Sequence, residues 1–511
     1  MKLNKFVCLL LVLVMTIVVC VGCGENDESS EPVSRSDVSD NPYVDENGNY
    51  VPTTSGNFYD GKTVTFLTCG VNTVQESEVC YNTYEDGSEH SLLEVLNDDL
   101  LKRSQKLEED LGIVVEEIYV FDGARKNGEF AKRVRQENMA PTEDFQVIVP
   151  CLYDGGTLAI SGELLNLYDI EGLQIEAPWW NQEFNETLTY GGQLYFTIGD
   201  IGLINKNSTA ALYFNYDLWA KFGLVEKFGG YPYDLVRDGK WTVDVVFEAA
   251  KVLGQDKNND GKIDYSDEFG WGGQLDDMWS IFFASGAKIA SADANGYPSL
   301  TMYSERTATL IEKLQDFVQD KEHYISANDY FGVAQWPTVL VQKAFTDGNA
   351  LFYNASLGTI IELGVMEQHF GIVPVPKADE GQDDYYSLVN PWTSTCFAIP
   401  NSVMGDHLVM TADALNYLGA YSKNTLAADY EQLAITYMKT RDDESIEMIN
   451  DYILPTRACD IGMIYQWGNL DIFLQELASS PKGTFASGYE AKADAAKEAL
   501  SEAVEFFKDH E

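Results

Sequence analysis

The chain has 511 residues, of which 45% are hydrophobic and 12% aromatic, and its formal net charge is −47. The length predicts two large folded parts, and the apolar content excludes a wholly disordered chain. The charge argues against nucleic acid and against an anionic membrane surface as partners, because both attract basic patches. We therefore expect a neutral or cationic ligand, with most of the 81 acidic residues serving solubility.

The N-terminus has the pattern of a secretory signal. Lys2 and Lys5 provide a positive start, and an apolar run from Phe6 to Val21 follows that is short for a membrane span. Gly22-Cys23-Gly24 comes next, so that a small residue precedes a cysteine. This arrangement predicts a lipoprotein signal peptide over residues 1–23.

The segment around Cys23 resembles a bacterial lipobox. The resemblance implies that Cys23 is lipidated and becomes the new N-terminus, which would anchor the protein to the outer face of the cytoplasmic membrane. The sequence departs from the usual pattern at Cys20, where Leu is favoured, and Cys20 itself is a poorer site because Val19 is not small. An unlipidated signal peptide or a signal anchor is the alternative.

Residues 24–58 are acidic and poor in apolar side chains. They contain eight acids and one base, Arg35, together with many Ser, Asn, Pro and Gly. Such a stretch cannot bury enough apolar surface to offset the entropy of ordering it. We predict a disordered acidic tether over this range.

The first folded part has the alternating pattern of an α/β sheet. Strands are predicted at 63–68, 113–120 and 145–149, and helical spacing of leucines predicts a helix over 92–111. Ligands of such sheets lie beyond the carboxyl ends of the strands, which points to the rim at 150–156.

Further strands are predicted along the rest of the chain, together with two helices. The helices are expected over 241–253 and 489–507, where Ala and larger apolar residues recur at helical spacing. The strands are expected at 194–197, 211–215, 350–353, 371–375 and 396–399.

Five cysteines follow the signal region, and none has the CxxC spacing of a zinc or redox site. Their apolar or small neighbours predict buried thiols. One disulfide remains open as an alternative, with Cys69 and Cys80 nearest in sequence. The five are Cys69, Cys80, Cys151, Cys396 and Cys459.

Residues 256–267 match a twelve-residue calcium loop. Oxygen side chains fall at positions 1, 3 and 5, a Gly at position 6 allows the sharp turn, and position 7 offers its carbonyl. We predict a structural Ca²⁺ ion in a single loop, against the alternative of a metal-free Asp/Asn-rich turn. The predicted ligands are Asp256, Asn258, Asp260, Lys262, Asp264 and Asp267.

Several blocks of the chain, in this order, resemble the extracellular carbohydrate-binding proteins of ABC importers that are related to maltose-binding protein. The resemblance covers most of the mature chain. The blocks are the lipobox with its tether, Pro178–Asn181, Gly191–Asp200, Leu212–Leu218, Gly239–Asp244 before the calcium loop, Phe345–Phe352 and Phe370–Lys377.

The resemblance implies an α/β, two-lobed, periplasmic-binding-protein-like (type II) fold with hinge crossings and an interlobe cleft. By analogy the chain crosses near 199–203 and returns near 392–398. One lobe would comprise 59–202 plus 396–450, and the other 203–395 plus 451–511. A sugar ligand, ABC permease and ATPase subunits, and a monomeric state are implied as well.

Sugars present apolar faces ringed by hydroxyls, so their sites combine aromatic platforms with Asp, Asn or Glu side chains. Positions after strands, at the crossings and near the C-terminus supply such residues, and Asp200 matches a polar ligand contact of the family. Core packing is the alternative for each aromatic side chain. The predicted ligand-binding residues are Tyr153, Asp154, Trp180, Asp200, Tyr353, Asn354, Trp392, Tyr465 and Trp467.

We predict a binding protein with no catalytic residues. A secreted glycoside hydrolase is the main alternative, since it needs only two suitably spaced carboxylates. GxSxG, HExxH and Gly-rich phosphate loops are absent from the sequence. A surface adhesin or dockerin-type module is a further alternative, although dockerins are short and carry two paired loops.

Overall fold

The computed structural model describes residues 41–70, 77–82, 91–122, 128–430 and 443–510. Its internal contacts separate residues 1–49 from a second unit, Tyr50–Glu511, which contains every helix and named strand discussed below. The predicted signal peptide, Cys23 and residues 24–40 of the tether lie outside the described residues. Within the described residues, no helix combines the length and the apolar character that crossing a membrane requires.

A parallel three-stranded sheet forms the first structural centre of the second unit. Its strands are β1 (Lys62–Gly70), β2 (Ile113–Phe121) and β3 (Val147–Val149), in the order β2-β1-β3. β1 and β2 pair along all nine residues, from Lys62↔Ile113 to Gly70↔Phe121. β1 is central and its inner residues are buried, which agrees with the β-branched and apolar pattern predicted for it.

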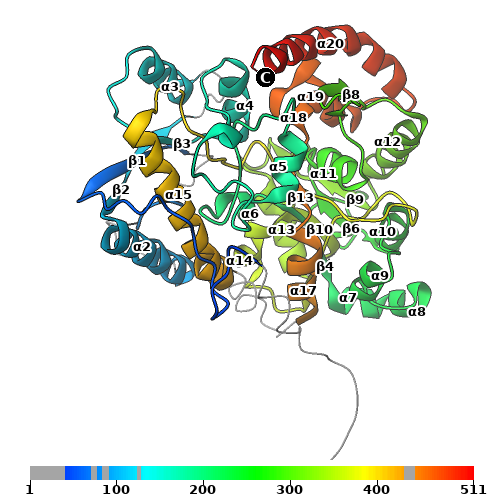
Figure 1. Ribbon diagram of the computed structural model, residues 1–511. Coiled ribbons are helices and arrows are strands. Elements are labelled where there is room, and N and C mark those ends of the chain that lie inside the picture. Colours follow the sequence, from blue (N-terminus) through cyan, green and yellow to red (C-terminus); the bar gives the residue numbers. More distant parts are fainter. Residues whose placement is uncertain (1–40, 71–76, 83–90, 123–127, 431–442, 511) are drawn as a thin grey trace, which may run out of the picture. The chain divides into compact units, whose positions relative to one another are not determined.

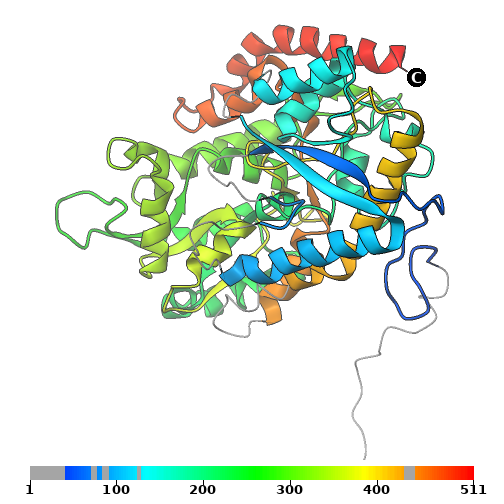
Figure 2. The same cartoon turned by 90° about the vertical axis from the view of Figure 1, so that its left-hand side faces the viewer.

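Helices cover this sheet (Figures 1 and 2). α2 packs against β2 and against α15, which in turn contacts β1, while α3 lies against β2. The predicted helix at 92–111 is confirmed with its start moved by one residue. The bounds are α2 Ser91–Leu111, α3 Glu129–Met139, α4 Leu152–Ile160 and α15 Gly405–Asn424.

The segment from Tyr50 to Tyr59 packs along α15, although the sequence predicts tether as far as residue 58. The amide N–H and the hydroxyl of Ser55 both donate to Asp413, at 2.8 and 2.5 Å, and the Tyr59 hydroxyl donates to the same carboxylate at 2.6 Å. Asn416 donates to the carbonyl of Thr53 at 3.2 Å. The folded unit therefore begins at Tyr50, earlier than predicted, because polar side chains of a distant helix bind a segment with little apolar surface.

A mixed six-stranded sheet forms the second centre. Its order is β11-β4-β10-β6-β5, and β9 also pairs with β6. β10 runs antiparallel to β4 and parallel to β6. The strands are β4 Ala210–Asn215, β5 Gly254–Gln255, β6 Glu268–Gly273, β9 Tyr324–Ser326, β10 Ala350–Ser356 and β11 Phe370–Val373.

One side of this sheet is closed by a hydrophobic cluster that includes Tyr213, Phe269, Phe345 and Tyr353. Phe345 belongs to α13 (Thr338–Thr346), which packs on β6 and β10. Successive side chains of a strand point to opposite faces, so Phe352, next to Tyr353, lies on the other face of the sheet. There it contacts Trp219, Trp241 and Trp271. Two buried aromatic layers thus hold the sheet.

Two segments pass between the sheets: residues 197–209, which include the short helix α6, and residues 389–400. In the first, Thr197 pairs with Phe397 and Thr209 pairs with Val389. In the second, residues 389–400 also pair with the first sheet, through Ile148↔Ala398. The sequence predicts strands at 194–197 and 396–399; the structure has only isolated bridges there, because each segment meets a different partner every few residues.

The remaining elements are mostly short helices around the second sheet and at the C-terminus. The predicted helix at 241–253 is α10, which is shorter, and the C-terminal helix α20 is longer than predicted. The other bounds are α5 Gln182–Leu188, α6 Ile204–Asn207, α7 Tyr216–Lys221, α8 Leu224–Phe228, α9 Pro232–Arg237, α10 Val243–Ala250, α11 Asp277–Ala284, β7 Ala290–Ala292, β8 Pro298–Leu300, α12 Glu305–Val318, α14 Ile360–Leu363, β12 Ser387–Leu388, α17 Asp443–Glu447, β13 Arg457–Ala458, α18 Ile461–Tyr465, α19 Leu470–Leu477 and α20 Phe485–Asp509.

The five cysteines after the signal region are free thiols in the structure, and all but Cys80 are buried. Cys80 is partly buried, and this partial burial raises its pKa to about 12, with a smaller contribution from the charge of Glu117. Protonated, buried thiols are poor nucleophiles. The prediction of buried cysteines is confirmed for the other four.

Candidate ligand-binding site

The carboxyl end of β3 leads into α4, where an exposed indole meets a buried phenol. The amide of Leu152 donates to the carbonyl of Ser394 at 3.1 Å, which draws the returning segment across the start of α4. Tyr153 and Trp392 consequently make an edge-to-face contact with ring centroids 6.1 Å apart. Tyr153 is 1% exposed and Trp392 is 48% exposed, so Tyr153 supports an aromatic surface that Trp392 presents to solvent.

A carboxylate with two amide partners stands beside the returning segment. Asp276, just before α11, accepts a hydrogen bond from Asn390 Nδ2 at 3.2 Å and one from Gln475 Nε2 of α19 at 2.6 Å. Burial raises the pKa of Asp276, and the two amide hydrogen bonds oppose that rise. Three elements distant in sequence therefore hold one half-buried carboxylate.

A second carboxylate lies at the start of α19. Asp471 accepts a hydrogen bond from Gln466 Nε2 at 2.6 Å, and its carbonyl accepts one from the indole of Trp279 at 2.7 Å. Burial raises the pKa of Tyr153, and among the charges that add to this rise Asp471 acts more strongly than Asp276. The charges of both carboxylates thus act on the Tyr153 phenol.

Tyr465 and Trp467 stack beside Gln466, with centroids 5.4 Å apart and planes within 8°. Gln466 adopts a left-handed conformation, φ 52°, which turns the chain sharply between the two rings. The Trp467 indole N–H and the side-chain amide oxygen of Gln466 (Oε1) are buried and have no hydrogen-bond partner among the described residues. Leaving such groups unsatisfied costs about 1–3 kcal/mol each, so a ligand that supplied partners for them would bind more tightly.

We call these residues the aromatic–amide cluster. It offers aromatic surfaces, amide donors and carboxylate acceptors, but contains no base. This combination matches a molecule with apolar faces and hydroxyl groups. The cluster comprises Tyr153, Asp276, Asn390, Trp392, Tyr465, Gln466, Trp467, Asp471 and Gln475.

No protein-family model matches the sequence, and no curated protein matches it either. Among solved structures, an ABC substrate-binding protein from Listeria monocytogenes in complex with cycloalternan superposes with a TM-score of 0.50 at 12% identity, over 87% of this chain and 98% of that one. The maltose-binding periplasmic protein of the same organism, in complex with maltose, gives a TM-score of 0.49 at 12% identity, over 88% and 99%. This chain has the fold of the ABC substrate-binding proteins. The fold class predicted from the sequence is confirmed.

Within this binding-protein fold, four of the predicted ligand residues fall in the cluster: Tyr153, Trp392, Tyr465 and Trp467. Asp154 is fully buried beneath it and lies 3.5 Å from the Cys151 thiol. Asn354 lies against α11, where its amide donates to Asp277 and Ser280, both at 2.8 Å. Residues 150–156 directly follow β3, as predicted, and their role in ligand binding stays a prediction.

Besides Asp154 and Asn354, three more predicted residues lie outside the cluster. Trp180 is 3% exposed and packs edge-to-face on Phe397. Tyr353 points to the opposite face of β10 from Asn354 and lies in the core cluster with Tyr213. Core packing, the alternative for both aromatics, describes their surroundings here.

Asp200 is the third of these residues, and it is engaged in a buried ion cluster. Its carboxylate lies 2.7 Å from Lys206 Nζ and 3.2 Å from Lys423 Nζ. Burial alone would raise its pKa, but the charges of Lys206, Lys423 and Arg457 outweigh this effect and lower it to about 2. The carboxylate is 5% exposed and is neutralised within the protein.

Sequence reasoning missed Asp276, Asp471 and Gln475. Asp471 and Gln475 stand four residues apart and hence on one face of α19, and Asp276 precedes an apolar helix. These signals are weak, because acid residues at helix starts are common for reasons of helix stability alone.

The predicted calcium loop connects β5 to β6 as a hairpin, with Gln255↔Glu268 and then Gly254↔Phe269 as the pairs below it. Asp256 accepts from the amides of Asn259 and Gly261, and Asp267 accepts from those of Lys257 and Asp264. Asn259 and Gly261 have φ of 60° and 87°, the left-handed turns that the motif needs.

The carboxylates of this loop are turned to backbone amides. No three His, Cys, Asp or Glu side chains in the described part of the chain converge as metal ligands, in this loop or elsewhere. The fully buried Asp267 and the motif spacing still agree with a loop of the calcium type. Calcium binding stays a prediction.

Proposed function

We propose that this protein is the substrate-binding component of an ABC importer and captures an oligosaccharide at the aromatic–amide cluster. The observation that carries this proposal is Trp392, an indole half exposed beside the Asp276–Asn390–Gln475 hydrogen bonds. An aromatic platform flanked by hydrogen-bonding side chains suits the apolar face and the hydroxyl groups of a sugar. The ABC substrate-binding protein from Listeria monocytogenes that shares this fold was solved in complex with cycloalternan.

Capture, with no bond made or broken, is the proposed mechanism. The two lobes, 59–202 plus 396–450 and 203–395 plus 451–511, would close over the ligand about the segments that pair at Thr209↔Val389 and Thr197↔Phe397. Closure would be a population shift, limited by the difference in ligand affinity between open and closed forms. The closed form would dock on permease and ATPase subunits.

We further propose that Cys23 carries the lipid that keeps the monomeric protein at the outer face of the cytoplasmic membrane. The Gly22-Cys23-Gly24 pattern after an apolar run supports this anchor. A Cys23→Ser chain expressed in a bacterial host should appear in the culture medium or the soluble fraction, while the parent chain fractionates with membranes. Equal membrane retention of both chains would contradict the anchor.

Trp392→Ala tests the site directly. Isothermal titration against a panel of neutral oligosaccharides should show weakening of about tenfold to a hundredfold, the usual loss for an aromatic hot spot of about 1.4–2.8 kcal/mol. Trp336, 62% exposed in the segment before α13, is the matched control, and Trp336→Ala should bind like the parent.

Chromatography of the same mixtures separates the proposal from the hydrolase alternative. Binding with unchanged glycans after prolonged incubation supports capture, and released sugars would replace it with hydrolysis. If the Trp392→Ala and Trp336→Ala chains bind with equal affinity, the cluster is not the site.

A further inference from the structure

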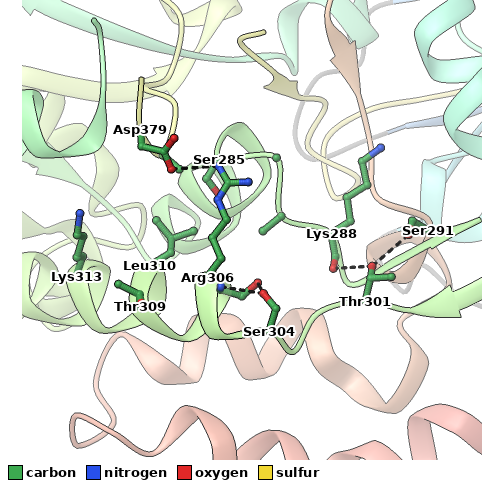
Figure 3. A pocket seen from close by; sticks show the side chains of 14 residues that line it. Ser285, Lys288, Ser291, Thr301, Ser304, Arg306, Thr309, Leu310, Lys313 and Asp379 are labelled. Carbon is green, nitrogen blue, oxygen red and sulfur yellow. Dashed lines mark hydrogen bonds and ion pairs between the residues drawn. The ribbon is translucent and has the colours of Figure 1, made fainter. Parts of the chain in front are cut away.

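A cavity of about 590 Å³ lies between the end of α11 and the side of α12, and none of the aromatic–amide cluster lines it. The loop 285–288, Ser291 and Thr301 form one side, residues of α12 form another, and Asp379 stands at its edge (Figure 3). Cavities of this size are typical of small-molecule sites.

The charge of this cavity is opposite to that of the chain. Among its lining residues are three bases, Lys288, Arg306 and Lys313, and one acid, Asp379. In the whole chain, acids outnumber bases by 81 to 34. A concentration of positive charge in a strongly acidic protein selects for anions at that place.

Arg306 is the central base. Figure 3 shows its side chain rising from α12 past Ser285 toward Asp379. The guanidinium lies 3.3 Å from the Asp379 carboxylate in a single contact, and both side chains are more than half exposed, at 58% and 56%. Exposed pairs of this kind contribute little to stability, so an incoming anion can replace Asp379.

The other two bases, Lys313 and Lys288, differ in their ion pairing. Lys313 donates to both carboxylate oxygens of Asp244 at 2.8 Å and is thereby largely neutralised. Lys288 has no carboxylate within ion-pair distance among the described residues; Glu183 and Asp460 act on it only from farther away. Arg306 and Lys288 therefore supply the usable positive charge.

Hydroxyl groups complete the lining. The Ser304 hydroxyl caps α12 by accepting a hydrogen bond from the Thr307 amide at 3.0 Å. It also lies 2.8 Å from the Thr307 hydroxyl. On the opposite side, the Thr301 hydroxyl donates to the carbonyl of Lys288 at 3.2 Å and lies 3.4 Å from the Ser291 hydroxyl. The first turn of the fourteen-residue α12 adds its own partial positive charge.

We propose that this cavity binds a polyhydroxylated anion, a sugar acid or sugar phosphate, with its oxyanion on Arg306 and Lys288 and its hydroxyls on the Ser and Thr side chains. A guanidinium forms paired hydrogen bonds with carboxylate or phosphate. The serine and threonine hydroxyls both donate and accept, as the hydroxyls of a sugar require. This second site is independent of the oligosaccharide site proposed above.

Isothermal titration of the mature chain tests this assignment with glucuronate, glucose 6-phosphate, inorganic phosphate and glucose. The two sugar anions should bind, and glucose should give no saturable signal at this cavity up to about 10 mM. Saturating neutral oligosaccharide should leave the anion affinity unchanged, because the two sites share no residue. Inorganic phosphate binding as tightly as both sugar anions would overturn the sugar component of the proposal.

Two variants with opposite expected effects sharpen the test. Arg306→Gln should weaken anion binding about tenfold or more, and Asp379→Asn should strengthen it by removing the competing carboxylate. Lys251→Gln removes an exposed base that does not line the cavity and serves as the control. Equal losses in Arg306→Gln and Lys251→Gln, or no anion binding by the parent chain, would overturn the proposal.

Discussion

Asp200 and Asp277 are both buried carboxylates, yet the protein holds them in opposite ways. Asp200, where the chain first crosses between the sheets, is surrounded by Lys206, Lys423 and Arg457, and its pKa falls to about 2. Asp277, at the start of α11, accepts from the indole of Trp271, the Tyr324 phenol and the Asn354 amide. Here burial outweighs the hydrogen bonds and raises the pKa to about 7.

The difference shows that hydrogen bonds from neutral donors do not replace a counter-charge. Three donors within 2.9 Å of the Asp277 carboxylate offset part of the pKa rise that burial causes, but they do not cancel it. At Asp200 full positive charges do cancel it. Asp200 is therefore ionised above about pH 2, while Asp277 takes up a proton near neutral pH.

The largest loss of stability is expected from removing the negative charge of Asp200 from its buried ion cluster. Asp200→Asn leaves Lys206, which is 2% exposed, without its counter-charge, so the free energy of unfolding should fall by about 3–5 kcal/mol. Urea denaturation measures the loss. Asp277→Asn keeps a neutral acceptor for Trp271 and Tyr324 and should cost about 1 kcal/mol. Equal losses in the two variants would contradict the comparison.

A third buried carboxylate, Asp267, extends the comparison, because its expected partner is a metal ion. If the 256–267 loop binds Ca²⁺, excess EDTA should lower the stability by about 3 kcal/mol relative to Ca²⁺ at a hundredfold excess over Kd. Differential scanning fluorimetry would show this as a melting temperature several degrees lower.

Two variants test this metal prediction. Asp267→Asn should remove the EDTA response. Asp293, which caps another turn through the amides of Asn295 and Tyr297 but lies outside the motif, is the matched control, and Asp293→Asn should retain the response. A parent melting curve that EDTA leaves unchanged would exclude the metal.

The pH dependence of stability should separate the two carboxylates by sign. The folded pKa of Asp277 is raised from 3.8, so its contribution is complete below about pH 4 and is lost as the pH rises through about 7. The folded pKa of Asp200 is lowered, so its contribution is complete above about pH 4 and is lost as the pH falls through about 2.

Urea midpoints near pH 4.5 and near pH 8 test this sign. The parent should lose about 1–3 kcal/mol relative to Asp277→Asn over this interval, since that variant no longer titrates there. Identical pH profiles for the two chains would show that Asp277 does not carry the predicted proton.

The smallest loss of stability is expected from Lys423, at the solvent-exposed edge of the Asp200 ion cluster. Lys423 has a side chain that is 29% exposed and lies 3.2 Å from Asp200, so solvent screens this pair more than the Lys206 pair. Lys423→Gln should cost about 1 kcal/mol in urea denaturation, and Lys102→Gln, at an exposed ammonium on α2, less than about 0.5 kcal/mol. A loss for Lys423→Gln as large as that for Asp200→Asn would contradict the graded burial of the cluster.

The sequence predicted the parts of the fold that local patterns determine. β1, β2 and α2 have continuous β-branched or leucine-rich patterns, and their bounds differ from prediction by at most two residues. The stretches 194–197 and 396–399 have a similar apolar pattern, but isolated bridges form there because strand formation also requires a neighbour with the same register.

The candidate site was only half predictable for the same physical reason. Tyr153 and Trp392 could be proposed from their positions after a strand and near a crossing. The amide partners of Asp276 stand 114 and 199 residues farther along the chain, and nothing local indicates that contact. For Asp200, the sequence showed a polar residue at a position that matches a ligand contact of the family, but not that Lys423, 223 residues away, joins Lys206 in neutralising it.

The hydrogen bonds between residues 50–59 and α15 determine how a pull on the N-terminus would be carried. Asn424 donates to the Tyr50 carbonyl at 2.8 Å, and Asp413 binds both Ser55 and Tyr59. These bonds stand before Lys62 along the chain, so tension applied at the N-terminus would reach α15 before it reached β1. These side-chain hydrogen bonds would therefore break first, before any force acted on the strands.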